Sequence, residues 1–169
     1  DLMALTKTIN PQKNENIGLI DISNTALTVV KSIVAAPSNR GINFYLIRQS
    51  NAFVKIDPND LEIVFRNIFS QFVKNTLNDE GVTCSISANS EKVTVSFYNF
   101  GQFDEKYRIA VDENAASEDD LSKNKIPGTE LGMSIVSNIL EDYNGTIKFE
   151  NENEKMKIEI NFEAQNNNV

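Results

Sequence analysis

The chain of 169 residues contains no histidine and no tryptophan, and its only cysteine is Cys84. The missing histidine excludes imidazole general-base catalysis, the usual serine and cysteine triads, and most zinc sites. A single cysteine excludes an intrachain disulfide and any cysteine-based metal cluster. Chemistry at a site in this chain therefore depends on carboxylates, amides, backbone groups or a bound cofactor.

Positive charge is also scarce, because 16 Lys and Arg residues stand against 24 Asp and Glu residues and give a formal charge of −8. Without a basic cluster, this balance argues against a nucleic-acid partner. The longest apolar runs fall well short of the ~20 residues of a membrane helix, and no signal peptide opens the chain. We expect a soluble segment in a reducing compartment, with no nucleic-acid partner and no membrane contact of its own.

The single cysteine lies in an alternating apolar run with Val82 and Ile86. On a strand, these three side chains point to the same face of the sheet. The pattern favours a buried, structural thiol at Cys84 over the alternative of a reactive one.

Composition divides the chain into three parts. Residues 1–16 combine the end of a helical pattern (1–9) with the polar linker NPQKNEN (10–16). We expect one domain over residues 17–163 and a frayed tail over 164–169. The abrupt start inside a helical pattern predicts that the segment belongs to a longer protein.

Periodicity predicts three helices and six strands in this domain. Asp21 or Ser23 can cap the first helix, and Asp57-Pro58 opens the second, which has the clearest amphipathic pattern. The predicted helices are at about 21–36, 58–76 and 131–143. The predicted strands are at about 42–47, 53–56, 81–88, 93–99, 146–151 and 155–162.

The order of these elements predicts an α+β fold. We expect a two-layer α/β sandwich, in which about three helices cover one face of a mixed, mostly antiparallel sheet. Residues 101–127 are polar, acidic and nearly aperiodic, which predicts a long loop before the last helix. A loop of this length in a compact domain is usually functional or mobile.

Polar residues line up on the second predicted helix. Asn67, Gln71 and Lys74 are spaced i, i+4 and i+7, opposite the apolar stripe. This line is consistent with an ordinary solvated helix face and with a polar binding stripe, and the spacing alone leaves both interpretations open.

Two further features lie at the ends of predicted elements. Asn99 ends a strand next to Gly101, where an amide either starts a turn or offers hydrogen bonds at the edge of the core. Gly128 and Gly132 bracket the start of the last helix. Glycines there let backbone N–H groups approach phosphate, and the helix dipole favours its negative charge.

These features coincide with three motifs of one known family. The segment DPNDLEIVFRNIFSQFVKNT (57–76) resembles an asparagine box, VTVSFYNFG (93–101) resembles the strand before a first glycine box, and PGTELGMSIVSNILEDYNGTIKFENE (127–152) resembles a second glycine box. In their order and spacing, the three motifs resemble the ATP-binding catalytic domain of sensor histidine kinases. This family belongs to the ATPase superfamily of gyrase, the ninety-kilodalton heat-shock chaperones and the mismatch-repair ATPases.

The resemblance implies a site for ATP and Mg²⁺ between the asparagine-box helix and the long loop. It implies that Asn99 recognises the adenine amino group and that Gly101 lets the backbone approach the base. The phosphates and Mg²⁺ would face Asn67, Gln71 and Lys74, with Gln71 at the metal-binding position. The residues of the second glycine box that would contact the nucleotide are Gly128, Thr129, Gly132 and Met133.

The resemblance also implies partners and a location. The γ-phosphoryl acceptor would be a histidine on a dimerisation domain of the same full-length protein, and a response regulator receiver domain would be a further partner. Residues 1–16 would be the end of a dimerisation helix and its linker. The domain would lie in the cytoplasm, either in a soluble protein or as the intracellular part of a membrane-bound sensor.

Departures from the family motifs leave a second hypothesis open. Gln71 replaces an asparagine that holds magnesium, Glu130 replaces the middle glycine of the second glycine box, and Gln102-Phe103 follows Gly101 where a further glycine is usual. These changes favour a degenerate pseudokinase or phosphotransfer scaffold with weak or no ATP turnover. A serine kinase of the anti-sigma-factor type is a third hypothesis, which fits the N-terminal residues less well.

Overall fold

The computed structural model describes residues 17–36, 41–77, 80–109, 129–153 and 155–165, and in residues 129–131 it describes the backbone alone. The elements are β1 (Leu19–Asp21), α3 (Ile22–Val34), β2 (Asn43–Arg48), β3 (Phe53–Lys55), α4 (Pro58–Asn75), β4 (Gly81–Ala88), β5 (Lys92–Tyr98), the 3-10 helix η2 (Glu105–Tyr107), α6 (Thr129–Asp142), β6 (Thr146–Glu152) and β7 (Lys155–Glu163).

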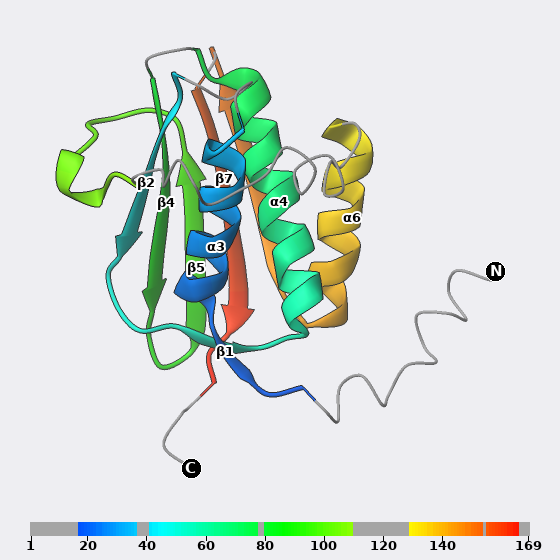
Figure 1. Ribbon diagram of the computed structural model, residues 1–169. Coiled ribbons are helices and arrows are strands. Elements are labelled where there is room, and N and C mark those ends of the chain that lie inside the picture. The colour runs from blue at the N-terminus through cyan, green and yellow to red at the C-terminus, as the bar shows by residue number, and fades with distance from the viewer. Residues whose placement is uncertain (1–16, 37–40, 78–79, 110–128, 154, 166–169) are drawn as a thin grey trace.

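The main sheet has the strand order β2-β4-β5-β7-β6. The pair β2–β4 is parallel and the other three pairs are antiparallel. Helices α3, α4 and α6 lie side by side over one face of this sheet, with α4 in the middle (Figure 1). The predicted two-layer sandwich with a mixed, mostly antiparallel sheet is therefore confirmed.

The helices begin where their capping residues predict. The Asp21 carboxylate accepts a hydrogen bond from the Ser23 N–H at 3.0 Å, so Asp21 and not Ser23 caps α3. The Asp57 carboxylate accepts one from the Asn59 N–H at 2.8 Å and caps α4, which has Pro58 at its first position. Each cap satisfies a backbone donor that has no partner within its helix.

Three elements differ from the prediction. Strand β1 was not predicted, and β3 pairs with β1 in a separate two-stranded sheet and not in the main sheet. A strand of three residues is too short to show alternation, so its pairing depends on tertiary structure. Helix α6 begins at Thr129, two residues before the predicted start.

The core lies between the helical layer and the sheet and is rich in phenylalanine. Phe69 of α4 has its ring centroid 5.8 Å from that of Phe44, 6.0 Å from that of Phe65 and 5.2 Å from that of Phe97. All four side chains are buried. Cys84 is buried in the same core and burial raises the pKa of its thiol, so the prediction of a structural cysteine is confirmed.

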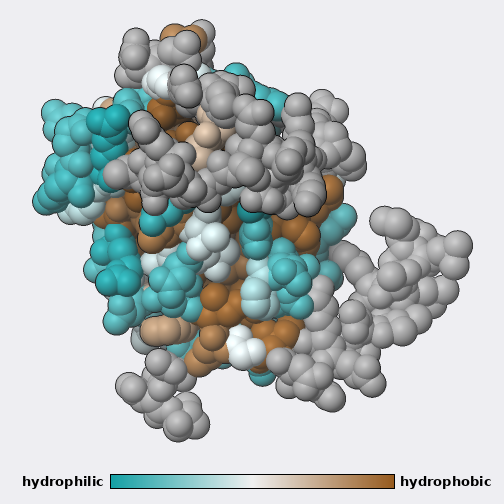
Figure 2. Space-filling model, viewed as in Figure 1, coloured by the Kyte–Doolittle hydropathy of each residue, from teal (hydrophilic) through white to brown (hydrophobic). Residues whose placement is uncertain are grey.

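The hydropathy of the surface on the helical side differs from one region to another. In Figure 2, polar residues cover the left edge around η2, and an apolar area lies low in the centre of the view. Leu19 of β1 is one of the exposed large apolar residues, with 41% of its surface accessible. No helix among the described residues is long and apolar enough to cross a membrane.

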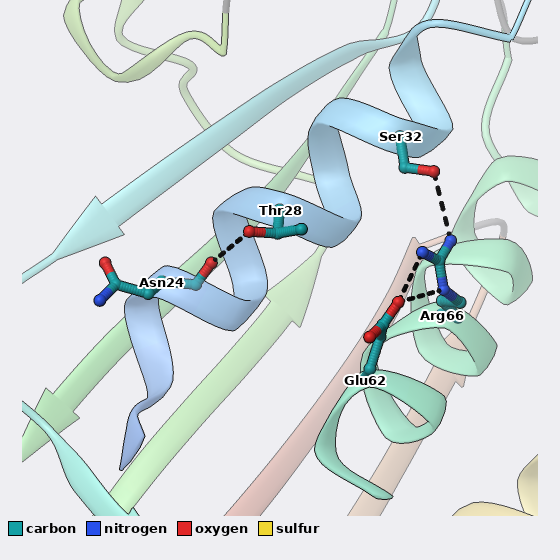
Figure 3. A network of polar contacts seen from close by, with 5 residues as sticks. All are labelled: Asn24, Thr28, Ser32, Glu62 and Arg66. Carbon is teal, nitrogen blue, oxygen red and sulfur yellow. Dashed lines mark hydrogen bonds and ion pairs between the residues drawn. The ribbon is translucent and has the colours of Figure 1, made fainter. Parts of the chain in front are cut away.

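Polar contacts fix α4 against its neighbours on both sides. On the α3 side, the Arg66 guanidinium donates to Glu62 Oε1 at 2.7 Å and to Ser32 Oγ at 3.3 Å (Figure 3). On the α6 side, the Tyr143 hydroxyl donates to Asp60 Oδ2 at 2.7 Å. Burial, together with this hydrogen bond, raises the pKa of the Tyr143 hydroxyl. These contacts hold the polar line of α4 in place beside α6.

Candidate functional site

Asn67 lies in the contact between α4 and α6. Its side chain is only 5% exposed, and Nδ2 donates to the Ile63 carbonyl at 2.7 Å. A Cβ built on Gly132 would be 2.5 Å from Asn67 Oδ1, so any larger residue there would require the buried Asn67 amide to move. A solvated position is therefore wrong for Asn67, and the structure places its side chain against Gly132.

The other two residues of the polar line are more accessible. Gln71, one turn further along α4, is half-buried, and Lys74 in the last turn is exposed. An amide oxygen and an ammonium group thus follow Asn67 toward the C-terminal end of α4. The exposed Lys74 ammonium can contact an anionic ligand without the cost of burying a charge.

Asn99 is buried where β5 ends, with 7% of its surface exposed. Its side-chain Oδ1 accepts a hydrogen bond from the Met156 N–H of β7 at 2.8 Å. Its Nδ2 donates to Thr76 Oγ1 at 3.3 Å. Thr76 is the C-terminal cap of α4 and is 8% exposed, so this bond joins the end of the asparagine-box helix to the end of β5.

Sequence reasoning did not identify Thr76 as a site residue. The available signal was its place as the last residue of the segment that resembles the asparagine box. Its contact with Asn99 spans 23 positions of the sequence. Residue patterns within one helix carry no information about such a contact.

Gly101 has a positive φ of 94°, and a Cβ there would meet nothing within 4 Å. The backbone conformation, and not a lack of space, therefore favours glycine. Two residues on, the Phe103 ring stacks on Tyr45 at a centroid distance of 5.1 Å. The Ile109 N–H donates to the Phe44 carbonyl at 2.8 Å, so the start of the predicted long loop packs along β2.

The second glycine box is described only in part. Gly128 lies outside the described residues, and so does the rest of the long loop, 110–127. The backbones of Thr129 and Glu130 form the first turn of α6, and their side chains are outside the description. Met133 is partly buried and packs against the core.

The donor atoms among the described residues are consistent with a Mg²⁺ ion that is held partly by substrate phosphates. The described residues contain no cluster of three or more carboxylate, thiol or imidazole groups that could hold a metal ion. Mg²⁺ usually keeps several waters and takes one or two protein oxygens together with substrate phosphates. The amide oxygens of Asn67 and Gln71 are donors of this kind.

Comparison with solved structures gives the fold. The catalytic domain of the histidine kinase ThkA matches with a TM-score of 0.63 and 19% identity, over 88% of this chain and 97% of that one. The Acinetobacter baumannii histidine kinase AdeS matches with a TM-score of 0.66 and 22% identity, over 98% and 76%. Full-length ShkA in complex with AMPPNP matches with a TM-score of 0.63 and 18% identity, over 89% and 32%.

Comparison of sequences alone adds nothing to this, because no family model and no curated protein matches the chain. The structural matches extend over most of the chain and include both layers of the sandwich. The chain therefore has the fold of histidine kinase ATPase domains.

Proposed function

We propose that this domain binds Mg-ATP and donates the γ-phosphoryl group to a histidine on an adjoining dimerisation domain, as part of two-component signal transduction. The observation that carries the proposal is the meeting of three motifs along α4. Asn67 packs against Gly132 of the second glycine box, and Thr76 binds Asn99 beside the first glycine box. The C-terminal end of α4 and the N-terminal end of α6 lie at the same end of the helical layer (Figure 1).

Each residue has a role that fits its environment. Asn99, held at the end of β5, recognises the base, and the turn at Gly101 gives the backbone access to it. Asn67 is fixed by its bond to the Ile63 carbonyl, which leaves Oδ1 on the α6 side, and the exposed Lys74 attracts phosphate. Mg²⁺ bound to the phosphates and Gln71 would neutralise the charge that develops during transfer.

Nucleotide binding by a similar structure supports the proposal. ShkA, which shares the fold, was solved with the nucleotide analogue AMPPNP. The acceptor must lie on another domain, because this chain has no histidine. Catalysis here therefore consists of positioning the phosphates and stabilising their charge, with no covalent intermediate on the chain.

One observation favours the alternative of a pseudokinase or phosphotransfer scaffold. Phe103 stands where the family usually has glycine, and its ring lies on Tyr45, close to Gly81. An anchored aromatic ring cannot give the backbone freedom that a glycine provides. Together with Gln71 and Glu130, this change favours the alternative of a domain that keeps the fold as a docking surface and turns over little or no ATP.

A phosphotransfer assay with γ-labelled ATP tests the proposal. We expect acid-labile label on a histidine-bearing dimerisation domain of the same protein, whether it is supplied in trans or in the full-length chain. The isolated chain should remain unlabelled, because it has no histidine. Label on the isolated chain would contradict the assignment of donor and acceptor, and nucleotide binding with no transfer to the partner domain would establish the scaffold.

The altered residues should weaken the site by separate mechanisms. Glu130→Gly removes a negative charge from the first turn of α6, and we expect Mg-ATP to bind about 5- to 30-fold more tightly, or about 1–2 kcal/mol, with a smaller gain for ADP. Gln71→Asn should improve binding with Mg²⁺ but hardly at all with EDTA, because Mg²⁺ requires exact ligand geometry. Calorimetry with both nucleotides measures these effects. Wild-type affinity in the micromolar range that neither change improves would eliminate the pseudokinase alternative.

A further inference from the structure

The orientation of the Asn99 amide is determined by its partners. A backbone N–H can only donate, so the atom that faces the Met156 N–H at 2.8 Å must be the carbonyl oxygen Oδ1. The amino group Nδ2 is then the atom that faces Thr76 Oγ1 at 3.3 Å. The Asn99 N–H also donates to the Met156 carbonyl at 3.3 Å, so β7 holds this residue through both backbone and side chain.

Met156 and Thr76 differ in how their bonds to the amide can be changed. The Met156 N–H belongs to the backbone of β7, at the point where it pairs with β6, and is the same for any residue there. Thr76 Oγ1 is a side-chain atom, and it is buried together with Asn99. If this acceptor is lost, the Met156 N–H still holds Oδ1, but the bond that fixes the amide from its amino side is gone, so the position of the amide is less tightly defined.

We propose that Thr76 is a positioning residue that sharpens the base selectivity of the nucleotide site, because it holds the amino side of the Asn99 amide and so keeps the acceptor Oδ1 in place. This inference rests on the proposed function. Adenine carries an exocyclic amino group, which donates, whereas hypoxanthine carries a carbonyl oxygen in its place, which accepts. A fixed acceptor therefore favours ATP over ITP, and an amide whose position is less tightly defined keeps less of this preference.

Binding of ATP and ITP to three variants tests this role. Thr76→Val keeps the shape of the side chain but removes the acceptor, and we expect the ATP/ITP affinity ratio to fall about fivefold, the size of one neutral hydrogen bond. Thr76→Ser keeps the hydroxyl and should keep the ratio. Thr28→Val, on the exposed surface of α3, is a matched control and should change neither affinity. If Thr76→Val does not fold, Thr76→Ala removes the same acceptor.

The outcomes separate this role from a purely structural one. Loss of packing would weaken ATP and ITP equally, so an unchanged ratio in a folded Thr76→Val protein overturns the inference and leaves the proposed function intact. A Thr76→Ser protein with the same loss of selectivity as Thr76→Val also overturns it. If the wild-type chain binds neither nucleotide, the proposed function fails, and the inference fails with it.

Discussion

Replacement of Phe69 by alanine is expected to lower the free energy of unfolding by about 3–5 kcal/mol. Phe69 is fully buried, and its ring contacts those of Phe44, Phe65 and Phe97. These residues come from α4, β2 and β5, so the ring joins the helical layer to the sheet. Its removal leaves a cavity at the centre of the core, which the rigid surroundings cannot fill.

Urea denaturation followed by circular dichroism measures this effect. Phe149→Ala is the matched control, because Phe149 is 48% exposed on β6 and should cost only about 1 kcal/mol. If Phe69→Ala does not fold at all, Phe69→Leu should still fold and lose about 1–2 kcal/mol. Equal losses for Phe69→Ala and Phe149→Ala would mean that the core is not organised around Phe69.

The second large effect is expected at the contact between α4 and α6. Gly132→Ala should destabilise the domain by about 1–3 kcal/mol, because the new Cβ would lie 2.5 Å from Asn67 Oδ1. In an Asn67→Ala background, the same change should be neutral or stabilising by up to about 1 kcal/mol, since alanine is the better helix former and the conflicting atom is gone. The sign of the effect of Gly132→Ala should thus depend on residue 67.

A double-mutant cycle measures this dependence directly. Gly18→Ala is the control for a glycine in open space, because a Cβ there would meet nothing within 4 Å, and its effect should be small in both backgrounds. If Gly132→Ala costs the same with and without the Asn67 side chain, the two residues do not touch. The proposed meeting of the asparagine box and the second glycine box would then lose its main support.

The sequence predicted most of the fold because the signals for it are local. Alternation and capping residues predict the three helices and six of the seven described strands, and Asp57-Pro58 marks the start of α4 correctly. Strand β1 and helix η2 have three residues each and were missed because no pattern marks them. Strand β3 is equally short, but it lies in the alternating run FVKI. The parallel pairing of β2 with β4 depends on tertiary contacts, and no local pattern encodes it.

The candidate site was predicted less completely than the fold. The polar line on α4 was recognised, but burial of Asn67 follows from the position of α4 between two other helices and from the absence of a side chain at Gly132. The contact between Thr76 and Asn99 likewise exists only once β5 lies beside the end of α4. A helical period identifies a face, and only the packing decides what that face contacts.

A titration of the isotope-labelled chain with Mg-ATP, followed through its amide chemical shifts, tests the central claim most directly. We predict saturable binding of one nucleotide, with the largest shifts at the C-terminal half of α4, at Asn99 and Gly101, and in the first turn of α6. Removal of Mg²⁺ should weaken this binding without moving it elsewhere. No saturable change at millimolar Mg-ATP, or shifts confined to the opposite end of the helical layer, would contradict a nucleotide site in this domain.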